Sequence, residues 1–412
     1  MRNPSIWACV LGVEKTVVER VAVEEDGSLV AKVRPRRSER QHCGLCRRRC
    51  PRYDWGDGRR RWRCLDLGYV VTYLEAEAPR VRCREHGVVV AAVPWARHGS
   101  NFTRAFEEQA AWLATHCSKS AVAGLMRVVW RSVGRIITRV VHEQRKSQDL
   151  LDGLRRIGID EISYRKGQRY LMVVVNHDTG RLVWAANGRD SATVRRFFTE
   201  LGQERCAKIE KVSCDGAEWI MTVVEEECPN ATICLDPFHV VQWATKALDE
   251  VRREVWNAAR IAGLTDDAKA LKGARWALWH NPGNITSRQR TTLAIIQKTN
   301  KPLYRAYLLK EQLRLVFQLP FDEAVRALDR WLSWARRCRL QPFVKLARSV
   351  TYYRADIEAA LQNRLSNALV ESTNTKIRLI TRRSFGFHSP APLIALAMLS
   401  LGGLCPPLPG RG

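Results

Sequence analysis

Three acidic residues of this sequence have the chemical type and the setting of ligands for divalent cations: Asp160, Asp215 and Glu371. Asp160 and Asp215 belong to apolar runs typical of β-strands, and Glu371 lies in a cation-rich helical segment. Hard ions such as Mg²⁺ or Mn²⁺ prefer oxygen ligands. Two of them, roughly 4 Å apart, can activate an attacking oxygen and stabilise the leaving 3′ oxygen of a phosphodiester. We therefore expect the three carboxylates to hold two Mg²⁺ (or Mn²⁺) ions for phosphoryl transfer.

Glu371 is the only acidic residue after Glu358. The pattern of residues 365–383 predicts a helix, in which Leu369, Ile377 and Ile380 form an apolar stripe. A second line on this helix carries Asn367, Glu371, Asn374 and Arg378. On local evidence, an exposed ion pair of Glu371 with Lys376 or Arg378 is an equally good explanation. The two upstream aspartates favour a catalytic role.

The elements that must position these acids come in a characteristic order. Three runs, 157–164, 170–176 and 181–186, predict an antiparallel meander, because turn residues separate the last two. A helix capped by Asp190 or Ser191 follows, and then two more strands end at Asp215 and Asp236.

This is the element order of an α/β ribonuclease H-like fold. Its first and fourth strands are neighbours, so Asp160 and Asp215 would meet, whereas Asp236 on the outer fifth strand would lie farther away. We therefore choose Asp215 as the second catalytic acid. A single aspartate at a strand end is more often a turn or helix cap, and only the combination favours a site.

The charge of the chain indicates a polyanionic partner. Its 412 residues include 68 basic and 42 acidic ones, which gives a net charge of +26 and a pI near 10.0. Between Arg34 and Arg63 we count twelve arginines against three acids, a local excess of nine. Clustered arginine suits forked contacts with phosphates, so a phosphate backbone is the expected partner, and a basic protein without such a partner is the alternative.

The N-terminal block has the spacing of a zinc site. Cys43-Gly-Leu-Cys46 is one ligand pair, and Cys83-Arg-Glu-His86 supplies a second. A structural, tetrahedral Cys₃His zinc site uses all four residues. Three other residues compete as ligands, namely His42, Cys50 and Cys64. Thirteen cysteines in a long chain without an export signal favour a reducing compartment over disulfides, and we expect a cytoplasmic, nucleoid-associated protein.

Residues 102–143 have the pattern of a helix-turn-helix. Helical stripes cover 102–115 and 130–143, and a short helix capped by Ser118 or Ser120 lies between them, before a break near Arg127. Arg131, Arg135 and Arg139 align on one face of the last helix, which we expect to enter the major groove. A helical bundle with a solvated arginine stripe is the alternative. We also expect Lys376, Arg378, Arg382 and Arg383 to contact DNA.

The remaining sequence completes a multidomain plan. Residues 237–351 are helical and rich in tryptophan, which indicates an all-helical insertion whose tryptophans are mostly core. The run 391–405 is too short to span a bilayer and predicts a buried helix. The expected domains are a zinc-binding module (1–97), a helix-turn-helix (98–150), a catalytic core in two parts (151–236 and 352–402), the insertion (237–351) and a tail (403–412).

These motifs together resemble insertion-sequence transposases of the ISL-three type over nearly the whole chain. The matching strings are Cys43, Cys46 and Cys83; Gly158-Ile-Asp-Glu161; Cys214-Asp215; Leu235-Asp-Pro-Phe-His-Val240; Ser366-Asn-x₃-Glu371-x₂-Asn374-x-Lys376; and Arg382-Arg-Ser-Phe-Gly-Phe387. The resemblance implies that Asp160, Asp215 and Glu371 are a DDE triad and that His239, in an Asp-x₂-His string, lies near it. His86 departs from the family pattern, which has a second Cys-x₂-Cys.

Three functions remain open from the sequence. The first is a transposase that cleaves and joins double-stranded DNA at its terminal repeats and in the target, acting as a homodimer that bridges two ends. The second is a zinc and helix-turn-helix regulator without catalysis. The third is a ribonuclease H-like nuclease or resolvase that hydrolyses strands without joining them.

Overall fold

The computed structural model describes residues 4–410, which form two compact units of mixed α/β structure. One unit comprises residues 1–150 and 377–412, and the other comprises residues 151–376. The division falls within one helix, α16 (Ala368–Arg383). Among residues 4–410, no helix combines the length and the apolar character needed to cross a membrane.

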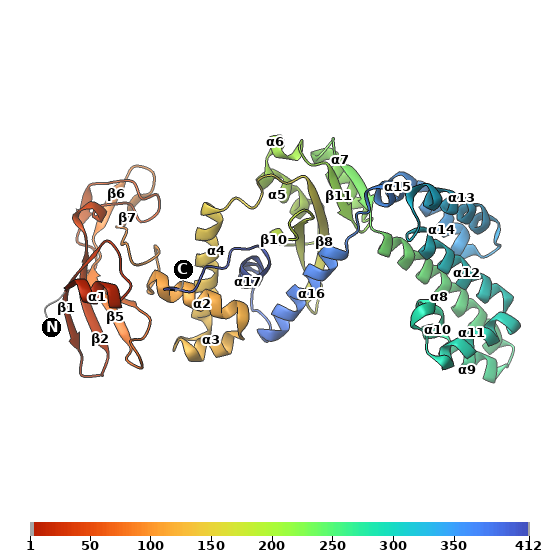
Figure 1. Cartoon of the computed structure of the whole chain (residues 1–412), viewed down its shortest axis with the longest axis horizontal. Coiled ribbons are helices and arrows are strands. Elements are labelled where there is room, and N and C mark those ends of the chain that lie inside the picture. Colours follow the sequence, from red (N-terminus) through yellow and green to blue (C-terminus); the bar gives the residue numbers. More distant parts are fainter. Residues whose placement is uncertain (1–3, 411–412) are drawn as a thin grey trace. The chain divides into compact units, whose positions relative to one another are not determined.

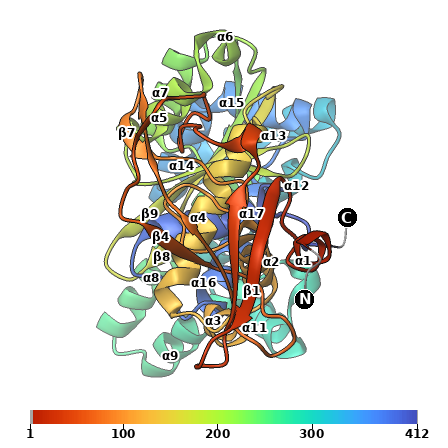
Figure 2. The same cartoon turned by 90° about the vertical axis from the view of Figure 1, so that its left-hand side faces the viewer.

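The first unit begins with a short helix, α1 (Pro4–Val10), and two small sheets. The larger sheet has the order β1 (Thr16–Val23), β2 (Leu29–Pro35), β5 (Thr72–Glu77) and β4 (Arg59–Arg63), and α1 packs on β1 (Figure 2). The smaller sheet has the order β3 (Arg52–Asp54), β6 (Arg80–Cys83) and β7 (Gly87–Val90). Trp62, Leu74 and Trp95 are buried in the core of the larger sheet.

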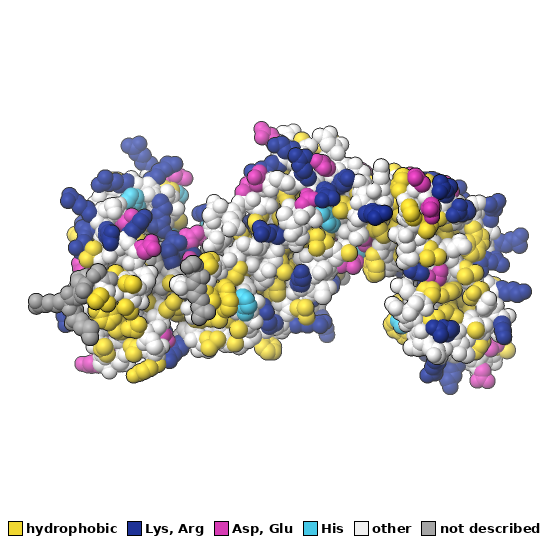
Figure 3. Space-filling model, in the orientation of Figure 1, with side chains coloured by type: hydrophobic (Ala, Val, Ile, Leu, Met, Phe, Trp, Pro, Cys, Tyr) yellow, Lys and Arg dark blue, Asp and Glu magenta, His cyan; other side chains and the backbone are white. Residues whose placement is uncertain are grey.

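Many arginines of the 34–63 stretch have acidic partners from outside that stretch. Arg34 pairs with Glu19 at 2.9 Å, Arg61 with Glu75 at 2.9 Å, and Arg63 with Asp66. The local excess of nine positive charges therefore overstates the free charge, because acids that lie outside residues 34–63 pair with these arginines. Lysine and arginine side chains are nevertheless widespread on the surface (Figure 3).

Helices complete the first unit and have the predicted pattern. α2 (Arg104–His116), α3 (Lys119–Leu125) and α4 (Trp130–Ser147) pack together, and α17 (Pro390–Leu401) packs on α4 and α2. The hydroxyl of Ser118 caps α3 by accepting from the amide of Ala121 at 3.2 Å. Arg127, at the predicted break, has a left-handed backbone with φ of 50°. The buried helix expected in the run 391–405 is α17, which ends at Leu401.

The second unit contains a five-stranded sheet. Its strands are β8 (Arg156–Arg165), β9 (Arg169–Asn176), β10 (Leu182–Asn187), β11 (Lys211–Cys214) and β12 (Thr232–Leu235), in the spatial order β10-β9-β8-β11-β12. The first three are antiparallel, and β11 runs parallel to both β8 and β12. The expected adjacency of the first and fourth strands is confirmed. Helices α5 (Ser191–Leu201), capped by Asp190, α6 (Gln203–Cys206) and α7 (Glu218–Glu227) connect the strands (Figure 1).

A purely helical segment lies between β12 and α16. It comprises α8 (Pro237–Ile261), α9 (Thr265–Gly273), α10 (Arg275–Trp279), α11 (Ser287–Thr299), α12 (Lys301–Val316), α13 (Phe321–Arg337), α14 (Gln341–Tyr352) and α15 (Arg354–Asn363). Of its six tryptophans, only Trp331 is fully buried, and Trp276 is 56% exposed. Trp243, Trp279 and Trp334 are half-buried and pack against the same core as Trp331, so the expectation that most of these tryptophans are core is confirmed.

The N-terminal part of α16 differs from the sequence pattern. Asn367 and Asn374 are buried and face the sheet together with Val370, whereas Leu369 is only half-buried. The amides are inside because they find hydrogen-bond partners there, as described below. Close packing of α16 on β8 depends on Gly158: a Cβ atom at this position would come within 2.4 Å of Cγ2 of Val370.

Candidate active site and zinc-ligand cluster

Strand register brings two of the predicted acids together. In the parallel ladder between β11 and β8, Ser213 pairs with Gly158. Asp160 and Asp215 come two residues after Gly158 and Ser213, respectively. One oxygen of each of these two carboxylates lies within 4.8 Å of the other and of an oxygen of Glu161. Parallel neighbours with this register deliver both aspartates to the same edge of the sheet.

Glu371 belongs to a second group that lies beside the first. One of its oxygens is within 4.8 Å of ligand atoms of Asp236 and His239. The two groups are electrostatically linked, since the charge of His239 acts on Asp160 and the charge of Asp215 acts on His239. Asp236 was expected to lie farther away than Asp160 and Asp215 lie from each other, and it is indeed outside their group. What the sequence did not predict is its closeness to Glu371, which arises because helix α16 begins against the end of β12.

Hydrogen bonds hold this arrangement in place. Asn374 donates to Oδ2 of Asp160 at 2.8 Å, and the amide of Glu161 donates to Oδ1 of Asp160 at the same distance. The backbone amide of Asn367 donates to Asp236 at 2.9 Å, and Asn367 Oδ1 accepts from the hydroxyl of Ser213. Asn374 of α16 and Asn367, which directly precedes the helix, thus connect α16 to β8, β11 and the end of β12.

The electrostatics of the cluster favour a bound cation. Asp160 is 8% exposed, and burial, reinforced by Asp215 and Glu161, raises its pKa to about 7. Burial and the charge of Asp215 also raise the pKa of Glu161, although Arg189 pairs with it at 2.6 Å. Oε2 of Glu161 and Oδ1 of Asn374 are buried, and neither atom has a hydrogen-bond partner among residues 4–410. An all-oxygen donor set with this excess of negative charge fits a hard divalent cation.

His239 lies in the first turn of α8 and contacts Asp236 through Nδ1 at 2.9 Å. Burial disfavours its protonation, but the hydrogen bond to Asp236 and the carboxylates of Asp215 and Asp160 outweigh burial and raise its pKa. The sequence pointed to His239 only through the family resemblance. Glu161, Asn367 and Asn374 were not singled out as site residues, although all three lie in the strings that carry the resemblance.

The four predicted zinc ligands also come together. Sγ of Cys83 lies 3.7 Å from Sγ of Cys46 and 3.6 Å from Nδ1 of His86, and Cys43 lies 3.8 Å from the same nitrogen. Ligands about 2.3 Å from a tetrahedral ion are about 3.8 Å apart, so these spacings fit zinc. The hydrogen bond from His86 lowers the pKa of Cys83 to about 6, which favours the thiolate that a metal needs.

Two competing ligands have different settings. Cys64 is buried in the core of the larger sheet, and burial raises its pKa to about 12. Cys50 lies beside the cluster but donates its thiol to the carbonyl of Arg48 at 3.4 Å. The ligand loop has no room for a side chain at position 44, where the sequence has glycine, since a Cβ atom there would lie 2.1 Å from His98 Nδ1.

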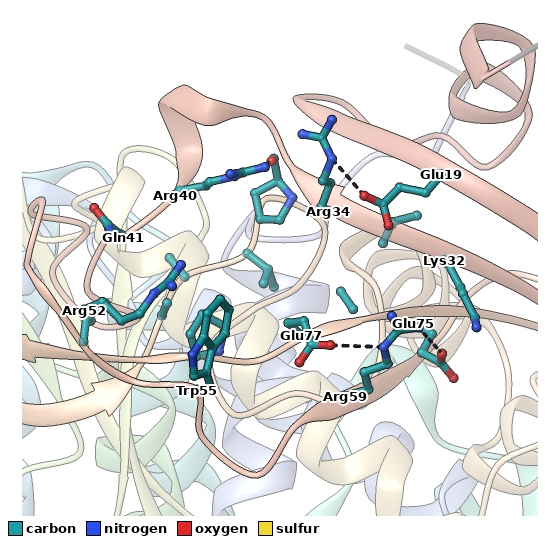
Figure 4. A pocket seen from close by; sticks show the side chains of 18 residues that line it. Glu19, Lys32, Arg34, Arg40, Gln41, Arg52, Trp55, Arg59, Glu75 and Glu77 are labelled. Atoms are coloured by element: carbon teal, nitrogen blue, oxygen red, sulfur yellow. Dashed lines mark hydrogen bonds and ion pairs between the residues drawn. The ribbon is translucent and has the colours of Figure 1, made fainter.

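A separate cavity of about 230 Å³ in the N-terminal unit has no such excess of acid (Figure 4). Its acids are paired: Glu19 with Arg34 at 2.9 Å, and both Glu75 and Glu77 with Arg59 at 3.2 and 3.1 Å. The guanidinium of Arg52 stacks 3.9 Å above the Trp55 ring. These neutralised carboxylates do not form a cation site.

The expected DNA-contacting cations have two kinds of setting. Arg131, Arg135, Lys376, Arg378 and Arg382 are exposed. Arg139 and Arg383 instead have partners within the first unit. Arg139 donates at 2.7 Å to Glu107, which is fully buried, and Arg383 donates at 2.9 Å to the carbonyl of Thr115 at the end of α2. These two arginines stabilise the helical part of the first unit.

Comparison with known proteins gives matches along most of the chain. A family model described as transposase matches residues 157–397, a helix-turn-helix domain of transposase family ISL3 matches 91–141, and the zinc-finger of transposases IS204/IS1001/IS1096/IS1165 matches 39–86. The transposase for insertion sequence element IS1557 of Mycobacterium tuberculosis is 53% identical over 100% of this chain and 98% of its own length. The transposase for element IS1001 of Bordetella parapertussis is 26% identical over 80% of this chain and 81% of its own.

Proposed function

Because the chain belongs to the ISL3 family of transposases, we propose that it binds the terminal repeats of its own insertion sequence and cleaves and joins DNA there. The observation that supports this most directly is the meeting of Asp160 and Asp215 at one sheet edge, with Glu371 in the adjoining group. A regulator without catalysis would have no need for these clustered carboxylates. The match to an end-binding helix-turn-helix favours a transposase over a simple nuclease.

Each residue has a proposed role in cleavage. Asp160, Asp215 and Glu371 would hold two Mg²⁺ or Mn²⁺ ions, and Asn374 keeps the carboxylate of Asp160 oriented by its 2.8 Å hydrogen bond. The bound cations would activate the attacking oxygen and offset charge on the scissile phosphate. His239, fixed by Asp236 at 2.9 Å, would donate a hydrogen bond to the substrate phosphate or hold a proton near it.

We further propose that the catalytic domain has a ribonuclease H-like fold. The strand order β10-β9-β8-β11-β12, with a parallel β8–β11 pair, supports this assignment. Residues 151–236 and 352–402 would be its two parts, and the helices between them would be an insertion into it. The zinc-binding and helix-turn-helix domains would occupy residues 1–97 and 98–150.

The partners follow from the same proposal. One structural zinc would be held by Cys43, Cys46, Cys83 and His86, and the exposed arginines Arg131 and Arg135 would contact terminal-repeat DNA. Two element ends must be cut in concert, so we propose a homodimer in the bacterial cytoplasm, associated with the nucleoid. Mass photometry with end DNA should then detect two chains with two ends, and a complex of one chain with one end would contradict the dimer.

One assay separates the three candidate functions. The full chain is incubated with labelled duplexes that carry its element's ends, with a supercoiled target and with Mg²⁺. A transposase produces joined end–target products, a nuclease produces only cleaved ends, and a regulator produces only a shifted complex. Omission of Mg²⁺ should abolish cleavage and leave binding.

A further inference from the structure

Lys119, the first residue of α3, carries an ammonium group in an unusual setting. The residue is only 2% exposed, and its Nζ lies 3.3 Å from the ring centroid of Trp130 and 5.1 Å from that of Phe387. Within residues 4–410, no carboxylate or carbonyl accepts a hydrogen bond from it. Cation–π contacts contribute up to about 2 kcal/mol, which is less than the desolvation of an unpaired charge. The ammonium therefore lacks a counter-ion.

The group faces a hollow of about 710 Å³ that is lined by cations. Lys119, Arg131, Arg135 and Arg139 line it together with Phe387 and His388, and none of the described residues that line it is acidic. Arg139 is already held by Glu107, so Lys119, Arg131 and Arg135 remain available to a ligand. The His388 ring stands edge-on to Trp130 at 5.5 Å and forms the far wall.

The hollow unites two distant parts of the sequence. Its cations belong to α3 and α4, the second and third helices of the helix-turn-helix match, whereas Phe387, His388 and Pro392 follow α16. The C-terminal residues pack on α4 through α17, whose Pro392 lies against Gly134. The hollow is therefore formed only when the C-terminal residues pack on the helices of residues 91–141.

The lining chemistry selects an oxyanion. A buried ammonium donates up to three hydrogen bonds, and a guanidinium presents a fork that matches phosphate oxygens. Burial lowers the pKa of Lys119 to about 8, and an adjacent anion would raise this pKa again because it stabilises the ammonium form. Since α4 is the helix expected to enter the major groove, the anion available at this place is the DNA backbone.

We propose that this hollow receives one backbone phosphate of the bound DNA end, and that Lys119, with Arg131 and Arg135, fixes the register of α4 on the duplex. Phe387 and His388 line the hollow beside these cations. These residues position the DNA and take no part in the chemistry. The inference rests on the proposed binding of terminal repeats.

The test pairs a protein substitution with a change in the DNA. Lys119→Met keeps the side-chain length and removes the charge. Its affinity for end DNA is measured by fluorescence anisotropy, on duplexes that carry a single neutral methylphosphonate at each position in turn. With the wild-type chain, we expect one position to weaken binding about tenfold, as for a charge-assisted hydrogen bond. With Lys119→Met, the same methylphosphonate should weaken binding much less than tenfold, because only Arg131 and Arg135 then contact that phosphate, and the salt slope should fall by about one.

Lys146→Met is the matched control, since Lys146 is an exposed lysine near the C-terminal end of α4, whereas the hollow lies at the N-terminal half of that helix. Its effect should add to that of the critical methylphosphonate. If Lys119→Met unfolds, the same cycle is run with Arg135→Gln, which alters an exposed side chain. The proposal would be overturned if the effect of Lys119→Met (or of Arg135→Gln in its place) simply added to the effect of the methylphosphonate at every position of the duplex. Failure of the wild-type chain to bind its ends would instead overturn the proposed function.

Discussion

The backbone amide of Asn367 donates a 2.9 Å hydrogen bond to Oδ1 of Asp236 and so ties the start of α16 to the end of β12. Asp236 is 1% exposed, and its other oxygen contacts His239 at 2.9 Å. Glu371 lies one turn into the helix, where its amide donates to the carbonyl of Asn367 at 2.8 Å. Asp236 therefore positions Glu371 indirectly, through the hydrogen bonds that Asn367 makes with both residues.

We expect Asp236→Ala to lower both stability and cleavage. The change leaves the buried amide of Asn367 without an acceptor, at a cost of about 1–3 kcal/mol. Asp236→Asn keeps the Oδ1 acceptor and should recover most of the lost melting temperature. Thermal melts are compared with end-cleavage assays for both variants. If Asp236→Ala melts like the wild type and still loses cleavage, Asp236 acts on the metal or substrate, and our choice of Asp215 as second acid must be revised.

Gly158→Ala should disrupt the contact between β8 and α16. The added methyl would come within 2.4 Å of Val370 Cγ2 and 2.8 Å of His177 Nε2, and such overpacking costs about 1–3 kcal/mol. Cleavage should fall about tenfold or more, since displacement of Glu371 weakens metal binding. Adding Val370→Ala should restore part of the activity. Gly273→Ala is the control, because nothing lies within 4 Å of its Cβ position; equal losses in both alanine variants would refute this packing argument.

Zinc content should identify the fourth ligand. Purified wild-type chain should carry about one zinc, and Cys43→Ser, Cys83→Ser and His86→Ala should each release it and unfold the N-terminal module, because metal binding and folding are coupled. Cys50→Ser should retain zinc, since its thiol donates to a carbonyl. Elemental analysis and circular dichroism provide the readouts. A zinc-free wild type, or zinc loss in Cys50→Ser with zinc retained in His86→Ala, would contradict the assignment.

The arginines of α4 should separate into binding and structural residues. Arg135→Gln should weaken end binding without changing the melting temperature, because its side chain is exposed. Arg139→Gln should destabilise the first unit by about 3 kcal/mol, since it removes a partner of the buried carboxylate of Glu107. Chemical denaturation and anisotropy distinguish the two effects. A stable Arg139→Gln variant with weakened DNA binding would show that Arg139 contacts DNA after all.

The success of the sequence-based predictions depended on how local each signal was. Strand patterns and the cap at Ser118 are local, and the structure has them where the pattern indicated. The inward orientation of Asn367 and Asn374 was missed, because helical periodicity assigns amides to the solvent face unless their partners are known. Those partners, Ser213 and Asp160, lie more than 150 residues away in the sequence. The ion pairs of the N-terminal arginines were missed for the same reason.

We propose that Asp160, Asp215 and Glu371 act together in metal-dependent cleavage. The most direct test compares Asp160→Asn, Asp215→Asn and Glu371→Gln, which preserve shape and remove charge, for cleavage and binding of the same end duplex in Mg²⁺. We expect each variant to lose at least about a thousandfold in cleavage rate while its affinity for end DNA stays within about twofold of wild type. A variant that binds normally and retains a tenth or more of wild-type cleavage would contradict the account.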